Sequence, residues 1–107
     1  MNCTEKAIDI ISGYIKKTYL QINVSAGQCR FNYECYRNAV HDAIKEGQDK
    51  VALVIYLDKG KPMFHCVNYK NGCYVDNTLG HWSTCMDFYF VAFIHKEYFF
   101  DIMEIIR

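Results

Sequence analysis

The dipeptide Asn71-Gly72 constrains the fold of this chain more than any other feature. It separates two runs, 63–69 and 73–78, that are rich in aromatic and β-branched residues. Asn-Gly between two such runs is the strongest short-range indication of a hairpin with a two-residue turn. The sequence therefore predicts an antiparallel strand pair whose register is defined by its turn.

This register places His65 and Asp76 on one face of the hairpin. With the two turn residues outside the ladder, Lys70 faces Cys73, and counting outward puts Val67 opposite Asp76. Side chains alternate between faces, so His65 is the diagonal neighbour of Asp76 on the same face. Diagonal neighbours lie about 7–8 Å apart by backbone, within reach of longer side chains. A carboxylate there can hold an imidazole in one tautomer and stabilise its cation.

The remaining elements are predicted from periodicity, caps and turn residues. Apolar spacing predicts a first helix over 5–20 with Thr4 as its N-cap, and 21–27 is expected to be a connection. A second helix is expected over roughly 26–46, with a capping box at Ser25 and Gln28 and with Gly47 at its end. Beyond the hairpin, strands are expected at 50–57 and 87–95, a loop at 79–86 and a short helix at 97–106.

This order, α-α-β-β-β-β-α, indicates an α+β fold with helices packed on a mostly antiparallel four-stranded sheet. With 107 residues, the chain is expected to form one domain spanning 1–107. No repeat or low-complexity segment interrupts the sequence.

Charge and hydropathy argue against several classes of protein. Twelve basic and twelve acidic side chains give a net charge of +0, without the basic excess of a nucleic-acid binder. The longest apolar runs fall far short of the roughly 20 residues of a membrane-spanning helix. The N-terminal residues lack the pattern of a signal peptide. We therefore expect a cytoplasmic protein whose six cysteines are reduced thiols, with no nucleic-acid or membrane partner.

Cys29 is the expected nucleophile. In a helix over 26–46 it lies in the first turn, where the helix dipole favours a thiolate, and on the apolar stripe that faces the sheet. The Gln28 side chain and the Cys29 backbone N–H are the expected oxyanion donors. Cys35 is the rival, because Asn32 is able to cap a shorter helix that has Cys35 in its first turn. Cys29 is preferred because Cys35 lies off the apolar stripe.

Three short motifs, in this order, resemble a known superfamily: Gly27-Gln28-Cys29 opening a helix, Phe64-His65 on a strand, and Gly72-x-Tyr74-x-Asp76-Asn77-Thr78. Together they resemble the papain-like cysteine peptidases and, more closely, the transglutaminase-like domains. The resemblance covers about residues 27–80, and the small chain resembles phage-type versions. It implies a papain- or transglutaminase-like core and a Cys–His–Asp triad for acyl transfer or for hydrolysis of peptide and amide bonds.

The leading functional hypothesis is therefore a cysteine acyl-transfer enzyme acting on a protein or peptide, without cofactor or metal. Cys29 attacks the carbonyl, His65 moves the proton and Asp76 orients His65, so Cys29→Ala is expected to abolish turnover. Asn77 and Trp82 are expected to line the substrate cleft.

Two alternatives remain open. One is a catalytically inactive binding or inhibitor module of the same fold that docks on a host protein. A weaker alternative is a zinc-stabilised domain using Cys66, Cys73 and Cys85 with His65 or His81, although no CxxC or HxxxH spacing supports it.

Overall fold

The computed structural model describes residues 2–30, 32 and 34–105 as an α+β fold with one mixed six-stranded sheet. The sheet order is β1-β6-β3-β4-β5-β2. The elements follow the chain as α1 (Cys3–Thr18), β1 (Leu20–Ile22), β2 (Val24–Ala26), α2 (Cys35–Glu46), β3 (Lys50–Asp58), β4 (Lys61–Lys70), β5 (Cys73–Asp76), the 3-10 helix η1 (Gly80–Cys85), β6 (Asp87–His95), the 3-10 helix η2 (Lys96–Tyr98) and α3 (Phe99–Ile105).

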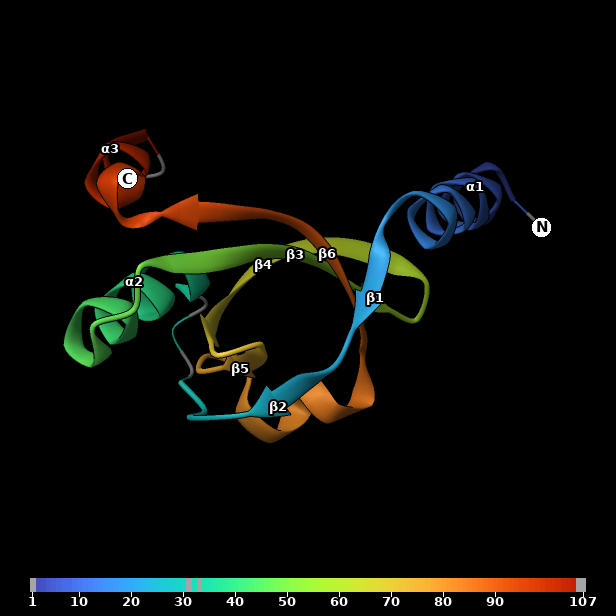
Figure 1. Cartoon of the computed structure of the whole chain (residues 1–107). Coiled ribbons are helices and arrows are strands. Elements are labelled where there is room, and N and C mark those ends of the chain that lie inside the picture. The colour runs from blue at the N-terminus through green and yellow to red at the C-terminus, as the bar shows by residue number, and fades with distance from the viewer. Residues whose placement is uncertain (1, 31, 33, 106–107) are drawn as a thin grey trace.

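The sheet curls until its two edges come close to each other (Figure 1). Its edge strands are β1, antiparallel to β6, and β2, parallel to β5, and only Asn23 separates them in the chain. A single residue spans only about 3.5 Å, so two edges joined in this way cannot be far apart. The pairing of β3 with β6 also shifts register between Leu53 and Val54, an irregularity of the kind that increases strand twist.

The hairpin predicted from Asn71-Gly72 is confirmed, including its register. Lys70 pairs with Cys73, and both turn residues have positive φ angles, 52° and 81°. Positive φ at both central positions is the requirement of a type I′ turn, which Asn and Gly satisfy with little strain. The strands at 50–57 and 87–95 are also confirmed, as β3 and β6.

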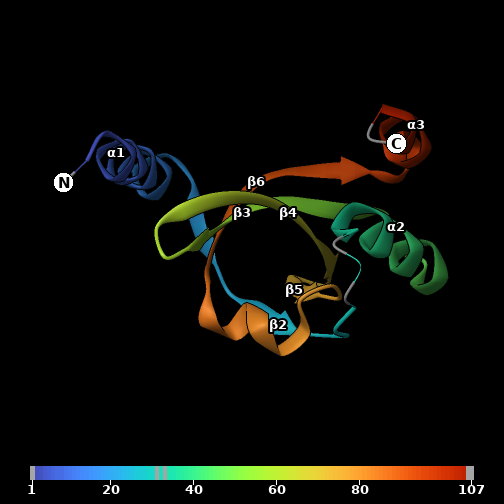
Figure 2. The ribbon, with the colours of Figure 1, turned by 180° about the vertical axis from the view of Figure 1, so that it is seen from behind.

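The two sides of the curled sheet are covered differently (Figures 1 and 2). The inner side is filled by a cluster built on Ala52, Val54, Val67 and Phe88. On the outer side, α2 and α3 pack together at one end, where the Tyr36 hydroxyl donates to the Phe99 carbonyl at 3.0 Å. At the other end α1 packs against β3 and β6 through Ile15.

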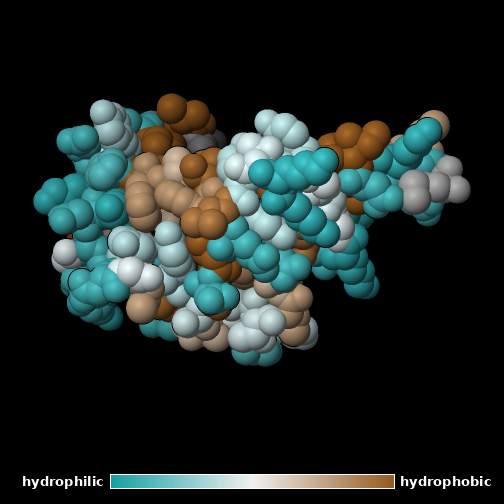
Figure 3. Space-filling view, turned by 45° about the vertical axis from the view of Figure 1, so that its right-hand side comes forward, coloured by the Kyte–Doolittle hydropathy of each residue, from teal (hydrophilic) through white to brown (hydrophobic). Residues whose placement is uncertain are grey.

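The first helix projects from the body of the molecule, with hydrophobic residues among the hydrophilic ones on its surface (Figure 3). Only Ser12 and Ile15 of its side chains are buried. Its N-cap is Asn2, which forms a capping box with Glu5, and not Thr4 as expected. A cap two positions N-terminal to a hydroxyl residue is easily misassigned, because Asn and Thr both favour that role.

The start of the second helix was predicted wrongly. This helix begins at Cys35, whereas Ser25 lies in β2 and pairs with Val75, so Ser25 and Gln28 do not form its capping box. The expected end at Gly47 is confirmed, since Gly47 adopts the left-handed conformation of a C-cap. Tyr33, expected on the apolar stripe, lies outside the described residues.

The expected number of four strands is also wrong, because β1 and β2 form two further strands in place of the expected connection, and β2 pairs in parallel. Each is only three residues long, too short to show alternation in the sequence. The expected loop at 79–86 contains η1, and the C-terminal helix is preceded by η2. Among the described residues, no helix combines the length and apolar character that crossing a membrane requires.

Candidate functional site

His65 and Asp76 form a buried polar pair at the end of the hairpin. The Nε2 atom of His65 lies 2.8 Å from Oδ2 of Asp76, and the side chains are 5% and 0% exposed. The other carboxylate oxygen accepts the backbone N–H groups of Thr78 and Leu79, both at 2.9 Å. The strand β5 ends at Asp76, and its carboxylate thereby organises the turn that follows. The diagonal placement predicted from the hairpin is thus confirmed.

Aromatic rings enclose the His65 imidazole on the inner side of the sheet. Tyr56 packs against it edge-to-face, with ring centroids 5.3 Å apart and an interplanar angle of 89°. Phe88 lies 6.3 Å away, centroid to centroid. These rings shield the His65–Asp76 pair from water and hold the imidazole plane. Because Nε2 is bonded to Asp76, Nδ1 is the nitrogen that is left for a second partner.

The other neighbour of the imidazole is Cys35, the first residue of α2, which lies close enough to shift the pKa of His65. The pKa of the Cys35 thiol is lowered well below its usual range, chiefly by a hydrogen bond with the Cys66 thiol, and also by His65, against the opposing effect of burial. Burial lowers the pKa of His65, but its hydrogen bonds with Asp76 and Cys35 outweigh burial and raise it to about 9. Both shifts favour a thiolate on Cys35 beside an imidazolium on His65.

The structure brings Cys35, and not Cys29, to His65. Cys29 precedes α2 and forms an isolated antiparallel bridge with Leu79. It packs against Gly80, where an added Cβ would lie 2.8 Å from that of Cys29. The predicted position of Cys29 in the first turn of a helix is therefore wrong, and the shorter helix considered as the alternative is the one observed.

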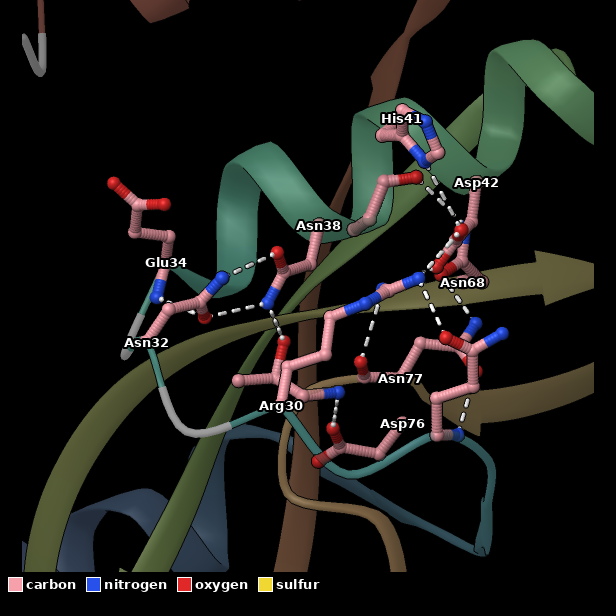
Figure 4. Close-up of polar contacts among 12 residues, drawn as sticks. Arg30, Asn32, Glu34, Asn38, His41, Asp42, Asn68, Asp76 and Asn77 are labelled. Carbon is pink, nitrogen blue, oxygen red and sulfur yellow. Dashed lines mark hydrogen bonds and ion pairs between the residues drawn. The ribbon is translucent and has the colours of Figure 1, made fainter.

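Arg30 fixes the connection between β2 and α2 (Figure 4). Its guanidinium donates to both carboxylate oxygens of Asp42 on α2, at 2.7 and 3.1 Å, and to the carbonyl of Asn77 at 3.1 Å. A fourth bond, at 2.7 Å, reaches the side-chain oxygen of Gln28. Arg30 is the main cause of the lowered pKa of Asp42, so the pair is ionised over the physiological range. This contact ties α2 to the turn after β5.

A chain of amides positions the N-terminal end of α2 on the same turn (Figure 4). Asn38 donates to Thr78 at 2.9 Å and to the side chain of Asn32 at 3.0 Å. Asn32 also accepts the backbone N–H of Glu34 at 3.1 Å, so it positions the N-cap residue of the helix without being the N-cap itself. The buried carboxylate and the cysteine are thus positioned by one network.

The expected substrate residues Gln28, Asn77 and Trp82 occupy different settings. The Asn77 side chain accepts the Gln28 backbone N–H at 3.0 Å and donates to Asn68 at 2.9 Å, so both its polar atoms bridge protein segments. A side chain at Gly27 would collide with Asn77, which explains the glycine. Trp82 is 53% exposed on η1 beside the ring of His81. Substrate contact by these residues stays a prediction.

The zinc alternative gains no geometric support. Within the part of the chain that the structure describes, no three His, Cys, Asp or Glu side chains converge as metal ligands. Cys73 and Cys85 are exposed and Cys66 is buried, and all six cysteines are free thiols.

Sequence reasoning missed two residues of the site. Cys66 was considered only as a metal ligand. Its position next to His65 was a signal that it belongs to the site, because the end of a helix at a strand edge can contact two successive strand residues. Arg30 left no such signal, because its partners Asp42 and Asn77 are remote in the sequence.

In comparisons with known proteins, no protein-family model, no curated protein and no solved structure matches the chain. The arrangement of Cys35, His65 and Asp76 is therefore the main indication of function. That geometry is of the kind found in activated nucleophiles, in which the base is itself oriented by a third group.

Proposed function

We propose that this chain is a cysteine-dependent acyl-transfer enzyme in which Cys35 is the nucleophile. The observation that carries the proposal is the contact of the Cys35 thiol with an imidazole whose Nε2 bonds a fully buried carboxylate at 2.8 Å. His65 is the acid–base group, and Asp76 is its orienting partner. The proposal keeps the chain order Cys, His, Asp of the papain- and transglutaminase-like proteins that the sequence resembles, with Cys35 in place of Cys29.

The reaction begins with attack of the Cys35 thiolate on a carbonyl carbon. The His65 imidazolium then donates its Nδ1 proton to the leaving amine or alcohol, and a thioester on Cys35 remains. In the second half, neutral His65 accepts a proton from water or from an acceptor amine, which displaces the acyl group. Asp76 holds the imidazole with Nδ1 toward sulfur and stabilises its cation in both halves.

The first turn of α2 supplies the best placed donors for the developing oxyanion. The first backbone bond of the helix runs from the Asn38 N–H to the Glu34 carbonyl, so the N–H groups of Cys35, Tyr36 and Arg37 precede it. Within the described residues, the N-cap residue Glu34 makes no side-chain bond that would cap them. Such N–H groups, beside the nucleophile, are the usual donors to a tetrahedral oxyanion.

The substrate class follows from this chemistry. A thiolate paired with an imidazolium acts on an acyl group whose leaving atom requires a proton, as in a peptide bond, an isopeptide bond or a side-chain amide. The choice between hydrolysis and transfer to an amine is then made by the acceptor that reaches the thioester. We propose a protein or peptide as the substrate, in agreement with the expectation from the sequence.

The test uses p-nitrophenyl acetate, a small activated ester that requires no knowledge of the natural substrate. The full chain should release one equivalent of nitrophenol in a burst and carry an acetyl group on Cys35, found by peptide mass spectrometry after an acid quench. Cys35→Ala should lose both the burst and the acetyl group. The matched control is Cys29→Ala, which should keep both.

Turnover after the burst depends on His65. His65→Ala should slow acetylation and deacetylation while the fold, followed by far-UV circular dichroism, is retained. Acetylation of Cys29 or of an exposed cysteine, or an unchanged burst in Cys35→Ala, would contradict the proposal. Either result would favour the alternative of a catalytically inactive binding module.

A further inference from the structure

Cys66 is a buried thiol that the proposed acyl transfer does not use. It is 6% exposed and belongs to the cluster between α2 and the sheet, against which Cys35 also packs. The two thiols are neighbours in this cluster, close enough for each to shift the pKa of the other.

The strand arrangement explains this neighbourhood. The strand β5 pairs with β4 only over Asn68–Lys70, so the edge of β4 is open at His65 and Cys66. Successive side chains on a strand point to opposite faces, so His65 faces the inner cluster and Cys66 faces α2. The N-terminal end of α2 lies at this open edge, where Cys35 contacts both residues.

We infer that Cys35 and Cys66 form a redox pair, in which a hydroperoxide oxidises Cys35 and Cys66 then closes a reversible disulfide. This inference goes beyond acyl transfer, and it needs only the contact of the two thiols. Its consequence for activity, reversible inactivation by oxidation, does rest on the proposed function.

Oxidation takes place in two steps, formation of a sulfenic acid on Cys35 and then of the disulfide. The Cys35 thiolate attacks one oxygen of the hydroperoxide; a sulfur–oxygen bond forms, the oxygen–oxygen bond breaks, and the leaving alkoxide or hydroxide takes a proton from the His65 imidazolium. The Cys66 sulfur then attacks the sulfur of the sulfenic acid, and water leaves with the Cys66 proton. In sum, two thiols lose two electrons and two protons, and the hydroperoxide is reduced to an alcohol, or to water.

The assignment of roles follows from the surroundings of each thiol. Cys35 carries the thiolate, the form that reacts with peroxides. The pKa of Cys66 is raised, first by its hydrogen bond to Cys35 and then by burial, so Cys66 is the protonated resolving thiol. Once Cys35 is a neutral sulfenic acid, the repulsion that keeps Cys66 protonated is gone. The exposed thiols Cys3, Cys73 and Cys85 lie outside the cluster that joins the pair.

The experiment treats the reduced full chain with one equivalent of hydrogen peroxide, blocks free thiols with iodoacetamide and digests with trypsin. Cleavage after Lys and Arg separates Cys29, Cys35 and Cys66 onto peptides 18–30, 31–37 and 60–70. The expected product joins 31–37 to 60–70 with the loss of two hydrogen atoms, and dithiothreitol reverses it. The same linkage should become a minor product when the chain is oxidised after unfolding in guanidinium.

Two variants remove the resolving thiol, so that the test can still be made if one of them does not fold. In Cys66→Ser and Cys66→Ala, peroxide should drive Cys35 to the sulfinic acid, which gains two oxygen atoms and is not recovered by dithiothreitol. Cys73→Ser, a change on the other strand of the same hairpin, should oxidise as the unchanged chain does.

Two results would overturn the inference: a sulfinic acid on Cys35 in the unchanged chain without the linked peptide, or a linkage of Cys35 to any other cysteine. Loss of nitrophenyl acetate turnover on oxidation, with recovery in dithiothreitol, tests the consequence for activity. Because the linked peptide is measured without a substrate, failure of the acyl-transfer proposal would leave this readout unaffected.

Discussion

The helices α1 and α2 both begin with a cysteine, yet the two cysteines stand in very different surroundings. Cys3 is exposed at the tip of a helix that buries only Ser12 and Ile15. Cys35 begins a helix with six buried residues and lies against the side chains of His65 and Cys66. A helix dipole is common to both positions, so we expect the tertiary neighbours of Cys35, and not the helix start, to decide the reactivity of its thiol.

The two helix starts also differ in their caps. The N-cap Asn2 of α1 accepts the Glu5 N–H at 2.8 Å, and the Glu5 carboxylate accepts the Asn2 N–H at 3.3 Å. The N-cap Glu34 of α2 makes no side-chain cap bond among the described residues. At the start of α1, the cap hydrogen bonds are thus made by neighbouring residues of the same helix. The start of α2 leaves N–H groups beside its cysteine and is stabilised by bonds to remote residues.

The largest loss of Cys35-dependent turnover is expected when the carboxylate of Asp76 is replaced by an amide. In Asp76→Asn an amide N–H donates to Nε2 of His65, so the neutral imidazole carries its proton on Nδ1 and cannot accept one from that side. The reaction rate kcat should fall by a factor on the order of 10⁴. Ester turnover by the folded variant measures this effect.

The pH dependence of kcat gives a second test of the role of Asp76. In the unchanged chain, His65 stays protonated until the pH rises through about 9, so its ability to protonate a leaving group declines only above that value. Without the Asp76 carboxylate the pKa of His65 falls, and the alkaline limb of the kcat profile should move to lower pH. An alkaline limb that stays in place would contradict the role given to Asp76.

A smaller effect is expected from the packing of α1. Ile15→Ala removes one of the two buried side chains of this helix, which packs on Ile55 and Leu57 of β3. Unfolding in urea should show a loss of about 2–5 kcal/mol, as for other large-to-small changes in a core. The control Ile10→Ala, at a position 67% exposed, should change stability by less than about 0.5 kcal/mol. Folded Ile15→Ala should keep the reactivity of Cys35, and loss of that reactivity would mean that the two ends are coupled.

The smallest effect concerns the cap of α1. Asn2→Ala breaks the capping box and should cost about 1 kcal/mol of stability. Thr4, the cap expected from the sequence, lies inside the helix, so Thr4→Ala should have little effect. The reverse order of these two variants in thermal unfolding would show that the helix begins at Thr4.

The sequence was sufficient for the hairpin because a local rule decided it. Asn71 and Gly72 select one turn type, this turn sets the register, and the register alone brings His65 and Asp76 together. The same holds for the end of α2 at Gly47, where a single glycine adopts the conformation that ends a helix.

The start of α2 could not be predicted in this way, because remote contacts decide it. The residues 24–26 have a helix-compatible pattern, but they pair with β5, and the Gly27 N–H donates to the Asp76 carbonyl at 2.9 Å. Arg30 then binds Asp42 and the carbonyl of Asn77, which ties this part of the chain to the turn after β5. Periodicity placed Cys29 in a helix, whereas these long-range bonds make Cys35 the first helical residue.

If tertiary neighbours activate Cys35, the two helix-initial cysteines should differ in reactivity within one molecule. The measurement is the rate of iodoacetamide labelling of each cysteine across a pH series, read by peptide mass spectrometry. The thiolate is the form that reacts with iodoacetamide, so a cysteine beside an imidazolium should label faster at about pH 5–6 than Cys3 or Cys29. Cys35 should label fast there, and His65→Ala should remove this advantage. Equal labelling of Cys35 and Cys3 at every pH would contradict the account.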